Sequence, residues 1–206
     1  MTRVETYTAI YGDFDTPRTY PVPVRLYTEA THPLPELPSP RLQAKYWKLR
    51  PDLACPDADV SIWIDGNIDI LRPDFPDLCL AALGDADAVF MAHPERDDIY
   101  EEAAVSLHFG KYDGMPLLEQ VCSYRRAGHP EHWGLFHAAL LVRRNTPAVQ
   151  ALDEAWWAEN VRWSIQDQLS LPPLLRTMPL DYRVFDVSPI QAGWVHWDGL
   201  HGQRRS

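Results

Sequence analysis

Short hydrophobic runs alternate along the chain with segments in which apolar residues recur at helical spacing. The runs are rich in β-branched and aromatic residues, and they predict strands over 4–12, 21–29, 59–64, 86–92, 136–142 and 182–187. Helical spacing predicts helices over 41–49, 74–83, 97–109, 115–126, 146–161 and 165–175. Strands that alternate with helices indicate an α/β fold with a mainly parallel central sheet flanked by helices. No internal repeat divides the chain, so we expect one domain over residues 1–206.

The strand predicted over 59–64 ends in three oxygen-bearing side chains at every second position, Asp65, Asn67 and Asp69. Side chains at i and i+2 of an extended segment point the same way, so Asp65 and Asn67 can share one divalent cation. Gly66 between them lets the backbone approach a ligand closely. A polar turn that simply closes a strand has the same composition. Both interpretations of this segment stay open, and Asp69 is a secondary candidate because it can equally begin the next turn.

The sequence does not match an EF-hand loop or the standard catalytic and nucleotide-binding motifs. An EF-hand loop that starts at Asp65 fails, since Ile70 stands where the loop needs glycine and Pro76 where it needs glutamate. The glycine-rich dinucleotide motif, the P-loop, the serine-hydrolase elbow and the H-E-x-x-H zinc motif are all missing. Three histidines at 129, 132 and 137 cluster without a cysteine that would complete a zinc spacing, so we interpret them as loop and strand-entry residues.

Charge and hydropathy limit the possible partners. The formal charge of −10 disfavours a nucleic-acid partner, because proteins that grip phosphate backbones usually carry a basic face. The chain has no apolar run of 18 residues and no signal-peptide pattern at its start, so we expect no membrane span. Three cysteines without close pairing, Cys55, Cys79 and Cys122, favour reduced thiols and a cytoplasmic location.

Five segments, in the same order along the chain, resemble one known family. They are TAIYGDFD (8–15), RLQAKYWKLRP with SIWIDGNI (41–51 and 61–68), AHPERDDIYEEA (92–103), WGLFHAALLVRRN (133–145) and WWAENVRWSIQDQLSL (156–171). This family of glycosyltransferase-like proteins from plants and bacteria was long filed as a domain of unknown function. It includes plant enzymes of cell-wall and mucilage polysaccharide synthesis. Five ordered segments are far more specific than a single D-x-N motif.

The resemblance implies a GT-A glycosyltransferase fold, which has a Rossmann-like sheet and a D-x-D-type motif that binds a metal and a sugar nucleotide. Asp65-Gly66-Asn67 takes the place of that motif, and Mn²⁺ or Mg²⁺ is the implied cofactor. Asn67 replaces a usual second carboxylate, which weakens the expected metal affinity. His196, in the C-terminal segment GWVHWDG, matches a late histidine that serves as a third metal ligand in related enzymes.

The resemblance also suggests where the donor binds. The loop after the first strand is where such folds seat the base and ribose, and here it carries Thr8, Ala9, Tyr11 and Gly12. A strand that ends in a turn has the same composition.

Basic side chains offer a second set of donor contacts. Arg41, Lys45 and Lys48 lie on one helix face, from which Lys45 reaches a diphosphate if the face points inward; pointed outward, the face is solvated. His93 and Arg96 follow the predicted strand 86–92, where the planar donors of an arginine suit phosphate or sugar hydroxyls.

Two further positions are expected near the reacting sugar. Asp167 and Gln168 lie in the first turn of the predicted helix 165–175, with Ser164 as its cap, and such a pair lines the sugar and acceptor pocket in related retaining transferases. Without the resemblance, Asp167 is equally well explained as a first-turn acid that favours the helix dipole. Glu101 is placed to approach the same cleft, whereas we expect its neighbour Glu102 to be exposed.

The sequence therefore predicts a metal-assisted glycosyltransferase that moves a sugar from a nucleotide-diphosphate sugar, in the first instance a UDP-sugar, to the hydroxyl of a carbohydrate or another acceptor. Three alternatives remain. The chain can be a nucleotide-sugar-binding module without catalysis, or a nucleotidyltransferase or nucleotide-diphosphate hydrolase on a similar sheet. It can also be a transferase that glycosylates modified bases in phage or bacterial DNA, against which the charge of −10 argues.

Overall fold

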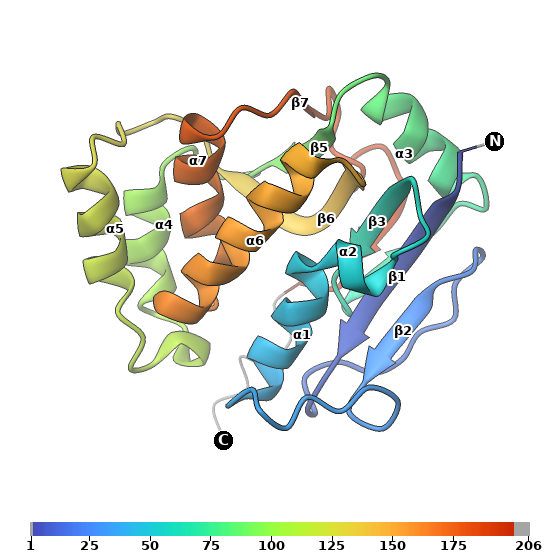
Figure 1. Ribbon diagram of the computed structural model, residues 1–206, viewed down its shortest axis with the longest axis horizontal. Helices are drawn as coiled ribbons and strands as arrows, with labels where there is room; N and C mark the ends of the chain where they lie inside the picture. The colour runs from blue at the N-terminus through green and yellow to red at the C-terminus, as the bar shows by residue number, and fades with distance from the viewer. Residues whose placement is uncertain (1, 200–206) are drawn as a thin grey trace.

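The central sheet of the computed structural model, which describes residues 2–199, contains six strands. They are β1 (Val4–Ile10), β2 (Arg25–Thr28), β3 (Val60–Ile64), β5 (Ala88–Ala92), β6 (Phe136–Arg144) and β7 (Tyr182–Val184). Their order across the sheet is β2-β1-β3-β6-β5-β7 (Figure 1). The pairs β1–β2, β1–β3 and β5–β7 are parallel, whereas β6 runs antiparallel to both of its neighbours. The predicted α/β fold with a mainly parallel sheet is confirmed.

Helices cover both faces of this sheet (Figure 1). On one face lie α1 (Pro40–Leu49), the short α2 (Pro51–Ala54), α6 (Pro147–Arg162) and α7 (Asp167–Thr177). Their side chains pack against the sheet in one core cluster, in which Leu49, Trp156 and Leu171 join Tyr7 and Trp63. The opposite face is covered by α3 (Phe75–Leu83) and by a two-stranded antiparallel sheet of β4 (Ile68–Ile70) and β8 (Val195–Trp197).

A third cluster extends the molecule beyond α7. Here α4 (Ile99–Ser106), the 3₁₀ turn η1 (Gly110–Tyr112) and α5 (Leu117–Arg126) pack on the start of α7. Ile99, Leu117 and Leu169 are among the buried residues of this cluster. Its position beside α7 brings η1 toward the same end of the sheet as α1.

Local sequence explains the two elements that matter most for the site. In β3, Val60, Ile62 and Ile64 face one core cluster and Trp63 faces the other, as expected for a strand buried on both sides. Helix α1 begins at Pro40, and the Ser39 hydroxyl caps it by accepting a hydrogen bond from Leu42 N at 3.2 Å.

Several predicted boundaries differ from the structure. The strands predicted over 4–12, 21–29 and 182–187 are each shorter, since Gly12 adopts a positive φ of 69° and the prolines at 21 and 23 lack the N–H that a ladder needs. The predicted helix 97–109 begins only at Ile99, where the Asp98 carboxylate caps it. Helix α7 begins at Asp167 with Gln166 as its N-cap, so Ser164 is not the cap residue; its hydroxyl donates to Gln120 and accepts a hydrogen bond from Gln166 N at 3.4 Å.

The elements α2, β4, β8 and η1 have no counterpart among the predictions, because each has only three or four residues. One of them changes the interpretation of Asp69: this residue does not begin a turn but lies within β4, opposite His196 of β8.

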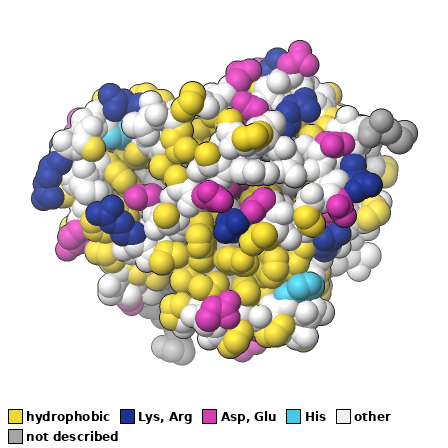
Figure 2. Space-filling model, in the orientation of Figure 1, with side chains coloured by type: hydrophobic (Ala, Val, Ile, Leu, Met, Phe, Trp, Pro, Cys, Tyr) yellow, Lys and Arg dark blue, Asp and Glu magenta, His cyan; other side chains and the backbone are white. Residues whose placement is uncertain are grey.

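The face drawn in Figure 2 carries a broad hydrophobic area over α1, with charged side chains spaced around it. On α1, the Tyr46 ring packs edge to face on Trp47 of the same helix and on Trp157 of α6. Within residues 2–199, no helix is both long and apolar enough to cross a membrane. The single domain expected over residues 1–206 stays a prediction.

Candidate functional site

A cavity of about 180 Å³ lies where β1 and β3 end. These strands are parallel, so their carboxyl ends meet at one edge of the sheet, which is where ligands bind in open α/β folds. Because β6 runs in the opposite direction, it brings its first residues to the same edge. The cavity is lined by Ala9, Ile10, Tyr11, Phe14, Asp15, Arg41, Ala44, Lys45, Lys48, Trp63, Asp65, Gly66, Asn67, Lys111, Tyr112, His137, Ile165, Gln168 and Trp197.

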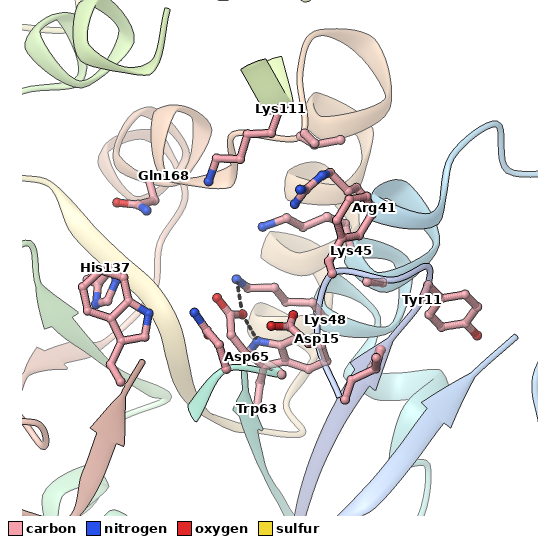
Figure 3. Close-up of a pocket in the computed structure, with 18 of the residues that line it drawn as sticks. Tyr11, Asp15, Arg41, Lys45, Lys48, Trp63, Asp65, Lys111, His137 and Gln168 are labelled. Atoms are coloured by element: carbon pink, nitrogen blue, oxygen red, sulfur yellow. Dashed lines mark hydrogen bonds and ion pairs between the residues drawn. The ribbon is translucent and has the colours of Figure 1, made fainter. Parts of the chain in front are cut away.

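Asp65 lies at the floor of this cavity, directly after β3 (Figure 3). Its Oδ1 accepts hydrogen bonds from Trp63 Nε1 at 2.7 Å and from Lys48 Nζ at 3.0 Å. Burial raises the pKa of Asp65, but Lys48 and Lys45 together outweigh that effect, and the pKa is lowered overall. Asp65 is therefore ionised at neutral pH and held in one orientation.

A second carboxylate fixes the lysines from behind. Asp167 Oδ2 pairs with Lys48 Nζ at 2.7 Å and also with Lys45 Nζ. The side chains of Asp167 and Lys48 are almost fully buried, at 4% and 2% exposure. Burial raises the pKa of Asp167, but the two ammonium groups dominate and hold it well below its usual range. Burial lowers the pKa of Lys48, yet Asp167 and Asp65 outweigh it, so the pKa is raised overall. All of these groups are thus charged.

The basic face predicted for α1 points into the cavity. Arg41, Lys45 and Lys48 all line it, and Figure 3 shows Arg41 and Lys45 projecting into the open space. The Arg41 guanidinium also lies over the Phe14 ring, 3.7 Å from its centroid. Burial, the largest influence, and the neighbouring Lys48 lower the pKa of Lys45 to about 8, so most of its population is protonated at pH 7.

Lys111 enters the cavity from the opposite side, on η1 (Figure 3). Its ammonium lies 4.7 Å from the centroid of the Tyr112 ring, and burial lowers its pKa. No pattern in the sequence marked this residue, because its position depends on how α4 and α5 pack beside α7.

Seven of the sequence-predicted site residues meet here. Ala9, Tyr11, Arg41, Lys45, Asp65, Asn67 and Gln168 line the cavity, and their assigned roles stay predictions. Gln168 presents a carbonyl oxygen, Oε1, that has no hydrogen-bond partner among the described residues. Asp167 itself does not line the cavity; it contacts the lysines that do.

Other predicted donor contacts lie elsewhere. Thr8 is buried within β1, and Gly12 turns the chain away while its N–H donates to Glu29. His93 and Arg96 follow β5, which β6 separates from β3, so the cavity does not reach them. Their roles in donor binding gain no support from this position.

Arg96 is instead committed to a carboxylate. Its Nε donates to Glu102 Oε2 at 2.7 Å, and the expectation that Glu102 is exposed is wrong, since it is buried at 4% exposure. Gln166 also donates to Glu102, at 2.7 Å. It is Glu101 that faces solvent, and it does not line the cavity.

The predicted metal ligands do not form a fitting donor set. Lys48 Nζ donates to Asp65 Oδ1 at 3.0 Å and neutralises that carboxylate, and Asn67 donates through Nδ2 to Gly199 O at 2.7 Å, so at most one oxygen of each side chain remains for a cation. His196 has a side chain that is 60% exposed and pairs with Asp198, while its neighbour Trp197 is the residue of β8 that lines the cavity. Within the described part of the chain, no three His, Cys, Asp or Glu residues are placed to hold a metal ion.

Sequence reasoning missed several lining residues, among them Asp15, Trp63 and His137. His137 lies at the start of β6 and packs edge to face on Trp197, with ring centroids 5.1 Å apart. Burial lowers the pKa of His137 to about 4, so its imidazole is neutral at pH 7. The reversed direction of β6 places it here, and a strand pattern alone does not reveal strand direction.

The fold resembles several solved glycosyltransferases at low sequence identity. No curated protein matches the sequence of this chain. Three solved structures are similar in fold over much of this chain. Mouse xyloside xylosyltransferase 1 has 10% identity and a TM-score of 0.47, covering 89% of this chain and 85% of that one. A glycosyltransferase involved in glycosylation of the major capsid of PBCV-1 has 10% identity and a TM-score of 0.42, covering 79% and 68%.

The third structure, the bifunctional glycosyltransferase WbbM, has 15% identity and a TM-score of 0.45; the match covers 92% of this chain but only 39% of that longer one. Likenesses this distant assign no activity.

The match to a protein family is more specific. The model of the TOD1/MUCI70 glycosyltransferase-like domain matches residues 38–187, a range that includes α1, Asp65, Lys111 and the start of α7. The chain therefore belongs to the TOD1/MUCI70 glycosyltransferase-like family.

Proposed function

We propose that this protein is a glycosyltransferase that moves a sugar from a nucleotide-diphosphate sugar, a UDP-sugar in the first instance, to the hydroxyl of a carbohydrate or another acceptor. One observation carries the proposal. A protein with a formal charge of −10 gathers four cationic side chains around one cavity at the carboxyl ends of β1 and β3, against two carboxylates in the lining and Asp167 behind Lys45 and Lys48. A cavity of this charge suits an anionic ligand, and the family is glycosyltransferase-like.

The residues of the cavity supply what sugar transfer needs. When the bond between the sugar and the diphosphate breaks, negative charge grows on the leaving group, and fixed positive charges lower the energy of that state. Lys45, Lys48 and Lys111 provide such charges without reorganisation, because the contacts described above already hold them. Gln168, one residue beyond Asp167, offers hydrogen bonds to the sugar or the acceptor.

The predicted Mn²⁺ or Mg²⁺ takes no step in this proposal, since the donor set around Asp65 does not fit it. We also propose a cytoplasmic location, as the three unpaired cysteines predict. Cys55, Cys79 and Cys122 are free thiols, which is compatible with a reducing compartment.

The test is a screen of sugar nucleotides for hydrolysis and transfer, with the variant Asp65→Ala beside the wild-type protein. We expect the variant to lose about 100-fold in turnover, because Asp65 orients Lys48 and Trp63 at the cavity floor and small misplacements of reacting groups have effects of this size. Asp77→Ala, an exposed change on α3, is the matched control and should leave turnover unchanged. Full activity of Asp65→Ala would remove Asp65 from the site.

The products of the same screen separate the alternatives. Release of the free nucleoside diphosphate with transfer of the sugar supports the proposal. Release of pyrophosphate or a monophosphate indicates a nucleotidyltransferase or a hydrolase. Binding without turnover of any donor indicates a module that has lost catalysis.

A further inference from the structure

The lysines of this protein are distributed in an unusual way. The chain contains only three, at positions 45, 48 and 111, and all three line the cavity. Every other basic side chain is an arginine, of which only Arg41 joins them there. A lysine ammonium is a compact, strongly hydrated point charge, whereas arginine is the more usual choice for ion pairs in a protein interior. The three lysines therefore mark one place where point charges are gathered.

These charges reach the cavity from two directions. Lys45 and Lys48 come from α1, and Lys111 comes from η1 on the other side (Figure 3). Lys45 and Lys48 are anchored by Asp167, which lies behind them. Lys111 is positioned over an aromatic ring, with its ammonium directed at the space between the two elements.

One of the lysines pairs with the carboxylate that the resemblance predicts as a metal ligand. Lys48 Nζ lies 3.0 Å from Asp65 Oδ1 and is almost fully buried. The same oxygen accepts the indole N–H of Trp63, so both contacts of that oxygen are satisfied by the protein itself. A protein cation thus already neutralises the carboxylate of the D-x-N motif.

From this arrangement we infer that the cavity binds the diphosphate of its nucleotide ligand with the ammonium groups of Lys45 and Lys111, supported by the charge of the buried Lys48 behind them, without a divalent metal ion. The inference rests on the proposed function, since it concerns how that same donor is held. The positive charge that a metal would bring is supplied by side chains. Asp65 then serves to orient Lys48 rather than to ligate an ion.

The experiment measures binding of UDP, GDP and ADP to the full chain by titration calorimetry, once in excess EDTA and once in MnCl₂. We expect at least one nucleotide to bind, with dissociation constants in the two buffers that agree within about threefold, since metal-free and metal-loaded conditions offer the same ammonium groups. The nucleotide that binds most tightly is then used with the variants.

Lys111→Met is the most informative variant. It removes one ammonium but leaves no buried carboxylate without its partner among the residues described, so the fold should survive. Lys48→Met is less suitable, because it would leave Asp65 and Asp167 without the lysine that pairs with both. We expect the affinity in EDTA to fall at least tenfold, and Lys111→Arg to recover part of it. Arg126→Met, which removes one positive charge from an exposed position on α5, is the matched control and should bind as the wild type does.

The outcomes separate this inference from the proposed function. Binding in MnCl₂ but not in EDTA would overturn the metal-free site and leave the glycosyltransferase proposal standing. Equal affinity of Lys111→Met and Arg126→Met in EDTA would also overturn it. No binding of any nucleotide in either buffer would overturn the proposed function together with the inference.

Discussion

At the scale of single residues, the decisive contact is the one between Asp167 and two ammonium groups. Lys48 is nearly inaccessible to water, and an isolated buried charge is strongly unfavourable. Asp167 offsets most of that cost, because it is itself buried, ionised and within 2.7 Å of Lys48 Nζ. This contact explains why two lysines can stay charged inside a cavity wall. It also makes Asp167 a residue that positions others, which differs from the expected place beside the sugar.

Replacing Asp167 with Asn should therefore destabilise the protein. The amide keeps the shape but removes the charge, which leaves two buried or half-buried ammonium groups with fewer partners. Loss of one partner from a buried ion pair typically lowers the free energy of unfolding by about 3–5 kcal/mol. Urea denaturation of Asp167→Asn and of Asp77→Asn, an exposed control on α3, measures the difference. Equal midpoints for the two variants would show that Asp167 does not anchor the lysines.

At the scale of elements, Arg143 of β6 connects three other parts of the fold. Its Nη1 pairs with Asp153 of α6, and its Nη2 donates to Tyr7 Oη of β1 at 2.9 Å and to Lys48 O at 2.7 Å. The last bond matters for the site, because it ties the end of α1 to the sheet. The backbone of Lys48 is thus fixed to the core by Arg143, and its side chain extends from there to the cavity.

Arg143→Met should weaken this connection and strand a buried carboxylate at Asp153. We expect a loss of about 3–5 kcal/mol in the free energy of unfolding. The double variant Arg143→Met, Asp153→Leu should recover part of that loss, since it removes both charges from the core. Urea denaturation of both variants and of Arg126→Met tests this. A double variant less stable than Arg143→Met alone would argue against a stranded charge as the cause.

The scale of elements also shows how far the sequence predicts this protein. Hydrophobic periodicity in the sequence predicts the strands of the central sheet and the longer helices that flank it, because this periodicity is a local property. The pairing of β4 with β8 joins segments far apart in the chain, and three residues carry too little pattern to reveal it. The resemblance predicts His196 as a metal ligand, but only the structure shows that this residue lies opposite Asp69 on a small separate sheet.

The site shows the same division. The sequence predicts Asp65 as a site residue from a strand end, Lys45 from a helix face and Gln168 from the family resemblance. The structure brings all three to one cavity. Lys111 and His137 reach it only through the packing of α4 and α5 and through the reversed direction of β6. Strand direction and helix packing depend on contacts across the whole chain, which no local window of sequence contains.

At the scale of the whole molecule, a buried neutral histidine couples stability to pH. His137 lines the cavity and packs on Trp197, and burial lowers its pKa to about 4 from an ordinary value near 6.5. The unfolded chain then takes up a proton on this residue at a higher pH than the folded protein does. The contribution of His137 to stability is fully present above pH 6.5 and is lost as the pH falls from 6.5 to 4.

The free energy of unfolding should accordingly fall by about 1.4 kcal/mol for each pH unit across that window through His137 alone. His93 and His129 also have lowered pKa values, caused chiefly by burial, so the wild-type slope includes them. The comparison with His137→Gln isolates one residue, because glutamine does not titrate and the other two histidines are unchanged. Urea denaturation of both proteins at half-unit steps from pH 4.5 to 7.5 should give a free energy of unfolding that falls more steeply toward low pH for the wild type than for His137→Gln. Parallel curves would mean that His137 is protonated equally easily in the folded and unfolded protein, and that the cavity floor is open to water.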